Sequence, residues 1–554
     1  MAVDMKKLRA RFKDLKNRRS PFEGRYQELV RYILPDAGRF EAFAPVKNGD
    51  QWAYIQDATA TDAVGALAAG MLGGITSPAR PWFRLTTGDA QADDRYENRQ
   101  WLSQVTEALQ LLFLRSNVYP ALIQCYEELA TFGTACLVAL PSEKEVIHVY
   151  PMTVGEYWIA EDFEHSVNTI FRRIEMTAEQ IVERFGDKAS RRVKEYMKDD
   201  RKRYEVFPII HAIYPRENYD PEKADNGDNT QFAYASVYFE ERWSDDGREE
   251  TPLLEEGFRT FPGLCPRWEI HGGSVYGTSP GMKALRQVKS LQVEFRRKGQ
   301  GIDELTNPAM IYPASMENHN VDFAPGGISW YPDGGTPQQA YPAKQVNINL
   351  QHLLMDIQDT RQQINAYFYK DLFTAIMSTP RTNRTAYEVD QIGQERMALL
   401  GPVLQRLNTE LLRPLIRMGL YCMEQKDMLP PMPEGMAGVT VSFESILVQA
   451  LRSSGITAED RYLSTAFSIA NFDSSIIDNI DLDKLIQKRG LDSGIDPDIM
   501  RSPEDVSAMR QRRQEMQAQQ NAMAQAQQMS EVVRNMQSVN PQIANNGIQA
   551  MQGY

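Results

Sequence analysis

The chain has few of the residue types that build metal centres and disulfide frameworks: its 554 residues include only four cysteines and six histidines. No two cysteines stand at the spacing of a zinc knuckle or of a redox-active pair, so we expect reduced thiols and no structural zinc. No two histidines stand at the helical spacing of metal ligands. We therefore expect neither a metal ion nor an organic cofactor.

Long apolar runs are absent as well. The most apolar window, Ala63 to Ile75, has about a dozen residues, whereas a membrane-spanning helix needs roughly 20. The basic stretch from Met1 to Ser20 lacks the apolar segment of a secretory signal. Both observations predict a cytoplasmic chain without a membrane segment.

Positive charge is in the minority, with 61 Lys and Arg residues against 74 Asp and Glu residues and a formal net charge of −13. This balance argues against a chain that coats nucleic acid or anionic lipid over its whole surface. It does not exclude DNA that passes nearby. Two small basic clusters, Arg286 to Lys298 and Arg381 with Arg384, taken alone, are more typical of solvated faces than of DNA contacts.

Catalytic motifs are missing too: the chain has no P-loop, dinucleotide-binding glycine fingerprint, zincin helix, nucleophile elbow or EF-hand at the required spacing. The glycine-rich stretch Gly272 to Gly277 lacks the lysine that reaches phosphate, so a turn is the better interpretation. We expect no enzyme. A metal-dependent DNA-processing hydrolase, with carboxylates gathered from distant positions, stays open as an alternative.

At about 150 residues per domain, the length indicates three or four folding units. Helical spacing of apolar residues predicts helices up to residue 130, with Gly65, Ala66, Ala69 and Gly70 allowing close helix contact. The predicted helices are Met1 to Ser20, Pro21 to Leu34, Asp57 to Met71, Asn98 to Arg115 and Pro120 to Phe132.

From Thr134 to Ile270 the pattern changes to short β-rich runs, which predict an antiparallel β-rich domain. One helix, Ala178 to Met197, interrupts it. The predicted strands are Cys136 to Leu140, Val146 to Tyr150, Val167 to Ile174, Val206 to Tyr214 and Phe232 to Phe239.

Two long helices follow, Ser279 to Leu305 and Leu350 to Phe373, and we expect an antiparallel pair with a small β-type tip between them. Gly299 and Gly301 weaken the far end of the first. A third helix begins with a capping box at Thr385 and is predicted to kink, because it contains two prolines.

The C-terminal part is predicted to hold a strand from Val439 to Phe443 and, from Pro503 onward, a Gln/Met/Ala-rich helix. One methionine per heptad gives too few apolar contacts for a coiled coil that is stable by itself. This helix therefore either becomes ordered against copies of itself or is a partly unfolded tail. A cytoplasmic adaptor that acts through this helix is a further alternative.

Several segments, in this order, resemble the head-to-tail connector, or portal, proteins of short-tailed, podovirus-type bacteriophages. They cover most of the chain. They are DATATDAVGALAAGMLGGITSPARPWF at Asp57 to Phe83, FGTACL at Phe132 to Leu137, GSVYGTSPGMKALRQVKSLQ at Gly273 to Gln292, NPAM at Asn307 to Met310, PGGI at Pro325 to Ile328, NRTAYEV through LGPVLQRLNTELLRPLI at Asn383 to Ile416, and RSPEDVSAMRQRRQ at Arg501 to Gln514.

The resemblance implies an α+β portal fold that forms rings. It has a wing of helices and β-rich structure, a pair of antiparallel stem helices, a small α/β clip, a long kinked wing helix and a C-terminal crown. The implied divisions are 1–278 wing, 279–306 stem helix, 307–348 clip, 349–373 stem helix, 374–384 tunnel loop, 385–500 kinked wing helix and lower crown, and 501–554 crown helix and tail.

The resemblance also implies a homo-oligomer, usually a dodecamer, at one vertex of the capsid in the virion, assembled in the host cytoplasm. Double-stranded DNA would pass through its channel during packaging and ejection. The implied protein partners are the terminase large subunit, the major capsid and scaffolding proteins and the tail adaptor or nozzle proteins, with no membrane involved.

Candidate site residues follow from these divisions. An acidic conduit lets DNA slide, because each neutralised phosphate adds affinity, and a few cations would then guide it. The channel candidates in the tunnel loop are Thr379, Arg381, Asn383 and Arg384, and those on the stem are Arg286, Lys289 and Arg297. The partner-binding candidates in the clip are Met316, Asn318, Asp322 and Trp330.

Overall fold

A computed structural model describes most of the chain, which divides into two compact units, Met1–Leu451 and Arg452–Tyr554. The residues described are 3–40, 52–93, 95–217, 229–243, 250–306, 349–377, 400–433, 438–443 and 503–539, with short pieces at 219, 222, 224, 310–311, 341–342, 435–436, 463–466, 468–469, 480–483 and 485–486.

The first helix, α1 (Met5–Tyr32), is a single element of 28 residues, so the predicted break at Pro21 is wrong. The side chain of Asp4 caps its start by accepting from the backbone amides of Lys6 and Lys7. Pro21 lies on the exposed side of the helix, where water can satisfy the carbonyl that the proline leaves unpaired. Packing of the opposite face keeps the helix continuous.

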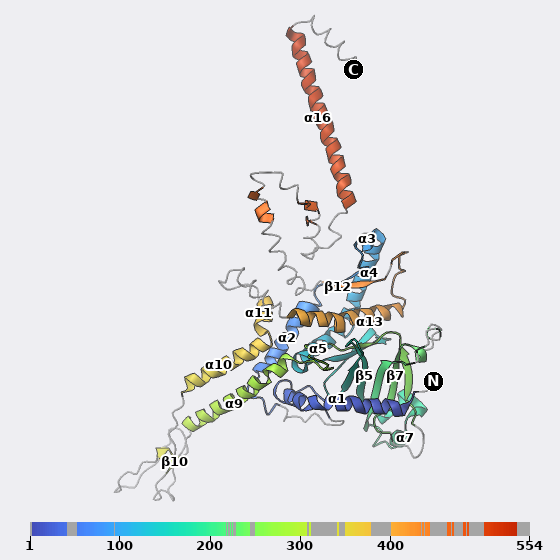
Figure 1. The fold of residues 1–554 in the computed structure, drawn as a ribbon, viewed down its shortest axis with the longest axis vertical. Helices are drawn as coiled ribbons and strands as arrows, with labels where there is room; N and C mark the ends of the chain where they lie inside the picture. Colours follow the sequence, from blue (N-terminus) through green and yellow to red (C-terminus); the bar gives the residue numbers. More distant parts are fainter. Residues whose placement is uncertain are drawn as a thin grey trace, which may run out of the picture. The chain divides into compact units, whose positions relative to one another are not determined.

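That apolar face of α1 covers one side of a five-stranded antiparallel sheet, as Figure 1 shows. Phe12 stands at the centre of the contact, with its ring 4.9 Å from Trp158 and 5.6 Å from Phe171. The strands follow chain order in an antiparallel meander. They are β4 (Tyr157–Glu161), β5 (Val167–Thr177), β6 (Val206–Pro215), β7 (Tyr234–Glu240) and β8 (Leu254–Phe258). The sequence predicted β5, β6 and β7 but not the two edge strands.

The other face of this sheet packs against two short helices, α6 (Ala178–Phe185) and α7 (Arg191–Lys198). The sequence predicted one helix here, which is wrong. Gly186 has a φ of +56°, which ends α6, and Ser190 then caps α7 by accepting from the amide of Val193.

The largest core lies between helices and a three-stranded sheet, in which β2 (Cys136–Ser142) pairs with β3 (Val146–Met152) and β9 (Gly263–Leu264). A two-stranded sheet joins β1 (Phe83–Thr86) to β12 (Thr440–Phe443), which confirms the strand predicted near Val439. The helices around this core are α2 (Thr59–Ile75), α3 (Ala90–Asp93), α4 (Tyr96–Arg115) and α5 (Val118–Phe132).

Among the small residues predicted to allow close helix contact on α2, Gly70 does so. A Cβ on Gly70 would stand 2.3 Å from the ring of Phe373, which belongs to α11 (Lys370–Met377). Gly65 has open space around it, and Ala69 is exposed. The close contact therefore anchors α11, whose last residues, 374–377, are helical although the tunnel loop was predicted to begin at residue 374.

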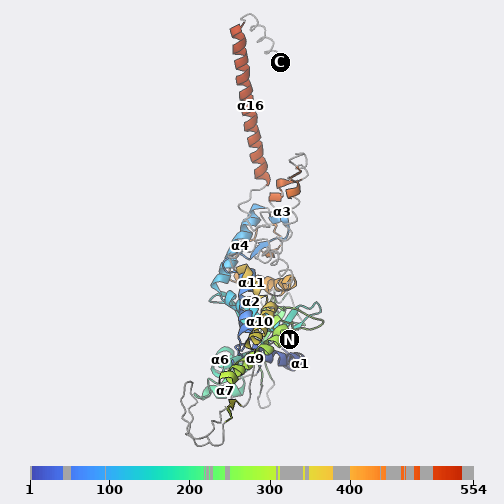
Figure 2. The same ribbon diagram turned by 90° about the vertical axis from the view of Figure 1, so that its left-hand side faces the viewer.

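Helices α9 (Pro280–Thr306) and α10 (Leu350–Tyr367) lie side by side and antiparallel, as predicted, and they stay adjacent in both views (Figures 1 and 2). The strands β10 (Met310–Ile311) and β11 (Tyr341–Pro342) pair beyond their far ends, so the described part of the tip is β-type.

The first helix of the pair has nearly the predicted extent, and the second does not. α9 continues through Gly299 and Gly301. The second helix is instead interrupted at Tyr369, whose φ is +54°, and α11 begins just after it. The predicted single helix from Leu350 to Phe373 is therefore wrong.

The third long helical segment, described from residue 400, has a π-helical turn at Asn408–Leu412 before α13 (Arg413–Glu424). Pro414 is the second residue after this turn, so the wider hydrogen-bond spacing accommodates the amide hydrogen that proline lacks. The predicted capping box at Thr385 lies outside the described residues.

In the second unit, α16 (Pro503–Val539) is a helix of 37 residues, about 55 Å long. Its methionine stripe is exposed, with Met516 and Met523 at 59 % and 71 %. An ion pair from Arg510 to Asp483, 2.6 Å, ties its first turns to the preceding segment. Among the helices that the structure describes, none is both long and apolar enough to cross a membrane.

Candidate functional site

The helix pair is held near the middle of α9 by one buried glutamine. The Gln292 Oε1 accepts from the backbone amides of Gln56, 2.6 Å, and Asp57, 2.9 Å, and its Nε2 donates to the carbonyl of Asp57, 2.9 Å. The side-chain amide thus pairs with backbone as a strand would. These bonds fix α9 to the residues that lead into α2.

Asp57 also connects the residues before α2 to α10, the second helix of the pair. Its Oδ2 accepts two hydrogen bonds from the guanidinium of Arg361 on α10, at 2.9 and 2.6 Å, and its Oδ1 accepts from the amide and hydroxyl of Thr59. Burial acts to raise the pKa of Asp57, but the hydrogen bonds from Thr59 and Arg361 outweigh it, and the pKa is lowered. Asp57 and Gln292 together form the clamp of the helix pair.

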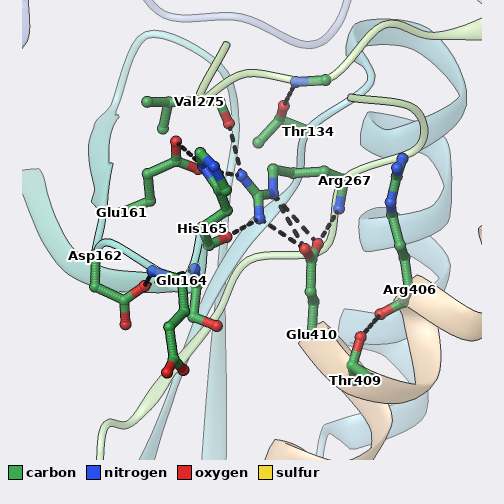
Figure 3. Close-up of polar contacts among 12 residues, drawn as sticks. Thr134, Glu161, Asp162, Glu164, His165, Arg267, Val275, Arg406, Thr409 and Glu410 are labelled. Atoms are coloured by element: carbon green, nitrogen blue, oxygen red, sulfur yellow. Dashed lines mark hydrogen bonds and ion pairs between the residues drawn. The ribbon is translucent and has the colours of Figure 1, made fainter. Parts of the chain in front are cut away.

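A second buried centre lies around Arg267, in the stretch that leads to α9 (Figure 3). Its side chain is 1 % exposed, and all five of its N–H donors have acceptors. Nε donates to Glu410, Nη1 to Glu161 and to the carbonyl of Val275, and Nη2 to Glu410 and to the carbonyl of His165. The Nη contacts to the two carboxylates are 2.8 Å for Glu161 and 2.7 Å for Glu410.

Burial opposes the charge of Arg267, but Glu410 and Glu161 more than compensate and raise its pKa. Its partners come from the β4–β5 hairpin, from the loop before α9 and from the π-helical turn. Glu410 lies in that turn and also accepts from the amide of Arg267, 2.9 Å. The Arg267 centre therefore locks three separate parts of the first unit together.

The start of α9 is formed by a close approach of two backbones. Gly133, with φ +78°, ends α5, and a Cβ on Gly277 would stand 2.2 Å from its carbonyl oxygen. Ser279 caps α9 by accepting from the amide of Met282, 2.9 Å, and donates to the carbonyl of Thr131, 2.6 Å. The two segments FGTACL and GTSPG are therefore in contact.

The Gly277→Ala substitution is expected to lower the free energy of unfolding by about 2 to 3 kcal/mol, since its methyl group must displace backbone rather than a side chain. Thermal unfolding measures this. The control is Gly273→Ala in the same loop, where nothing lies within 4 Å of the new Cβ. Equal melting temperatures for the two variants would show that the close approach at Gly277 is unimportant.

A buried acid on α5 makes stability depend on pH. Burial raises the pKa of Glu128 to about 8, against hydrogen bonds from Thr153 and from the amide of Val154. An acid whose pKa is higher in the folded than in the unfolded protein stabilises the folded state when it is protonated. Its contribution is complete below the unfolded pKa, about 4.5, and is lost as the pH rises towards the folded pKa, about 8.

We therefore expect the wild type to lose more thermal stability than Glu128→Gln between about pH 5 and about pH 9, because glutamine does not ionise. Melting temperatures of both proteins across this range measure the difference. Parallel curves for the two proteins would rule out Glu128 as the titrating group.

The three predicted stem candidates lie in different surroundings from one another. Arg286 and Arg297 are exposed on α9. Lys289 instead pairs with Glu28 of α1, and its Nζ lies 5.5 Å from the centre of the Tyr32 ring, so in the single chain its charge is used to hold α9 against α1. The candidates Thr379, Arg381, Asn383, Arg384, Met316, Asn318, Asp322 and Trp330 lie outside the described residues.

The thiols and carboxylates give no sign of redox or metal chemistry. All four cysteines are free and buried, although Cys136 and Cys265 lie with their Sγ atoms 3.4 Å apart. Burial raises the pKa of Cys136, so its thiol stays protonated. Among the described residues, no three His, Cys, Asp or Glu side chains gather as a metal site needs. The clamp and the Arg267 centre position helices and loops relative to one another.

Comparison with known proteins gives strong matches over nearly the whole chain. Residues 5–500 match the family model of the bacteriophage head to tail connecting protein. The chain is 39 % identical over 531 residues to the "probable portal protein" of Bordetella phage BPP-1, covering 94 % of this chain and 93 % of that protein. It is 37 % identical over 532 residues to the "portal protein" of Salmonella phage epsilon15, covering 95 % and 94 %.

A solved structure titled as the neck of an empty GTA particle covers 78 % of this chain and 94 % of that chain, at 11 % identity and a TM-score of 0.37. A TM-score of this size supports no structural argument.

Proposed function

From the premise that this chain belongs to the bacteriophage head to tail connecting protein family, we propose that it is the portal at one vertex of a phage capsid. The observation that carries this is identity to two portal proteins, 39 % and 37 %, over 93 % and 94 % of their lengths. The proposed assembly is a homo-oligomeric ring, a dodecamer, through which double-stranded DNA enters the capsid and later leaves it.

In this proposal, α9 and α10 are the stem that surrounds the channel. The residues between them, 307–348, form the clip that meets the terminase large subunit and then the tail adaptor. The wing, residues 1–278, meets the capsid and scaffolding proteins. The clamp of Asp57 and Gln292 supports this assignment, because it fixes both helices of the pair to the residues that lead into α2.

The proposed role is structural and needs no catalytic residue. Assembly takes place in the host cytoplasm and the mature ring lies at the head-tail junction of the virion. Nothing in the comparisons favours a metal-dependent hydrolase or an adaptor that acts through its C-terminal helix.

The deciding experiment is the native mass of the purified protein, by native mass spectrometry, followed by electron microscopy of the same fraction. The expected result is a closed ring with a central hole. A variant that lacks Pro503–Tyr554 should still form rings, because the main contacts are proposed to lie in the wing and stem. A monomer or dimer that stays so with scaffolding protein present would overturn the proposal.

Two arginines of the proposed tunnel loop are expected to guide DNA. Replacing both Arg381 and Arg384 with Ala should reduce DNA packaging and retention several-fold while rings still form, because two cations near the phosphates are lost. The measurement is the amount of DNA protected from nuclease in packaging reactions. The control is the pair Arg191→Ala and Arg192→Ala, two exposed residues of α7. Unchanged packaging in the Arg381/Arg384 variant would refute the guiding role.

A further inference from the structure

A cavity of about 330 Å³ opens beside the five-stranded sheet, between β3, β5 and α6. It shares no residue with the clamp or the Arg267 centre. Tyr150, which is 43 % exposed, and the exposed Arg184 both line it, so solvent reaches it. Four arginines line it, namely Arg39, Arg172, Arg173 and Arg184.

Two of these arginines are neutralised by carboxylates. Arg39 pairs with Glu156 at 3.1 Å, and Arg173 pairs with Glu241 through Nε at 3.0 Å and Nη2 at 3.1 Å. Neither pair contributes a net charge to the cavity, which a third carboxylate, Glu175, also lines.

Arg172 is different because it is buried, at 6 % exposure, without an anion. Its Nε donates to Nδ1 of His211, 2.9 Å, and the His211 Nε2 lies 2.9 Å from the hydroxyl of Ser236. Burial, then the charges of Arg172 and Arg184, lower the pKa of His211, so the imidazole is neutral and accepts from Arg172. Among the described residues, no carboxylate lies within ion-pair distance of Arg172, and its two terminal nitrogens have no hydrogen-bond acceptor.

Arg184 supplies the second uncompensated charge. It lies over the rings of Tyr238, at 5.3 Å, and Phe185, at 5.7 Å, and within the described chain no carboxylate pairs with it. Tyr238 in turn stacks on His211 with ring centres 3.9 Å apart. One aromatic stack therefore holds both guanidinium groups at the same cavity.

We propose that this cavity binds a phosphate group, as inorganic phosphate or a phosphate monoester, between Arg172 and Arg184. Guanidinium groups present planar pairs of donors that match phosphate oxygens. A phosphate monoester carries a charge of about −1.5 to −2 at neutral pH and has three acceptor oxygens, so it can pair with Arg172 and Arg184 at once. The volume is at the lower end of small-ligand sites, about 300 Å³, which suits a small anion.

Isothermal titration of the full-length protein with sodium phosphate, at ionic strength held constant with sodium chloride, tests this. Saturable binding at one site per chain is expected. Arg184→Gln should weaken it about tenfold or more, because a charge-assisted pair is lost. Arg184 is exposed, so this variant should fold; equal melting temperatures without phosphate check that.

The matched control is Arg192→Gln, which removes another exposed arginine that lies over two rings, Tyr196 and Phe207, on α7 away from the cavity. It should bind phosphate as the wild type does. Competition by adenosine 5′-monophosphate but not adenosine would identify a small phosphorylated molecule as the source. Competition only by a 5′-phosphorylated oligonucleotide would identify a DNA end. Absence of saturable phosphate binding, or equal binding by the Arg184 and Arg192 variants, would overturn the proposal.

Discussion

Replacing Arg267 with methionine is expected to lower the free energy of unfolding by about 3 to 5 kcal/mol, the typical cost of breaking a buried ion pair. Methionine fills a similar volume, so the loss comes from charge and hydrogen bonding. Glu161 and Glu410, whose side chains are 12 % and 19 % exposed, would be left without their cation. Chemical denaturation with the midpoint and slope fitted separately measures the change.

Two further variants separate the causes. Arg267→Lys keeps the charge but has three donors instead of five, so an intermediate loss is expected. Arg406→Met is the control, because the side chain of this neighbouring arginine makes one bond to the described residues, 3.3 Å to the carbonyl of Trp268. If Arg267→Met were no less stable than Arg406→Met, the Arg267 centre would not hold the unit together.

Replacing Gln292 with leucine is expected to cost about 3 kcal/mol or more and to loosen the helix pair. Leucine has a similar size, but the amides of Gln56 and Asp57 and the carbonyl of Asp57 would lose their buried partner. Hydrogen exchange should therefore accelerate in α10 as well as in α9, since Asp57 also accepts the hydrogen bonds of Arg361 on α10.

The control for this change is Gln300→Leu, an exposed position on the same helix. It removes the same functional group without a buried partner, and a change within about 0.5 kcal/mol is expected. Unaltered exchange in α10 of the Gln292 variant would show that the clamp does not couple the two helices.

The helix pair was predictable because its signal is local. Leu285, Val288 and Leu291 repeat at helical spacing, and all three are buried in the structure. The short apolar runs of the sheet were predictable for the same reason. The mixed helix and sheet composition and the family resemblance are likewise confirmed.

The errors arise where distant contacts outweigh a local rule. Pro21 predicts a helix end, yet burial of Phe12 and its neighbours against the sheet keeps α1 whole. Conversely, nothing near Tyr369 predicts a break in the second helix of the pair. The turn there lets Phe373 reach Gly70 of α2, a contact that no spacing within the segment indicates.

The two buried centres could not be predicted for a related reason. Arg267 is a single arginine in a stretch without periodicity, and its carboxylate partners stand 106 and 143 positions away in the sequence. Asp57 and Gln292 do fall at the ends of segments that carried the family resemblance, but their pairing across 235 positions has no sequence pattern.

The pairing of β1 with β12 also fixes the order in which the chain folds during synthesis. Phe83 and Phe443 are directly opposite, 360 positions apart, so at about 5 to 20 residues per second the ribosome needs roughly 20 to 70 s to make the second strand. One edge of β1 is covered early, because Thr106 and Gln110 of α4 bond to its backbone. The other edge of β1 stays unpaired until residues 440–443 emerge from the ribosome. During this interval the nascent chain is most exposed to pairing of β1 with another copy that is being made on the same messenger RNA.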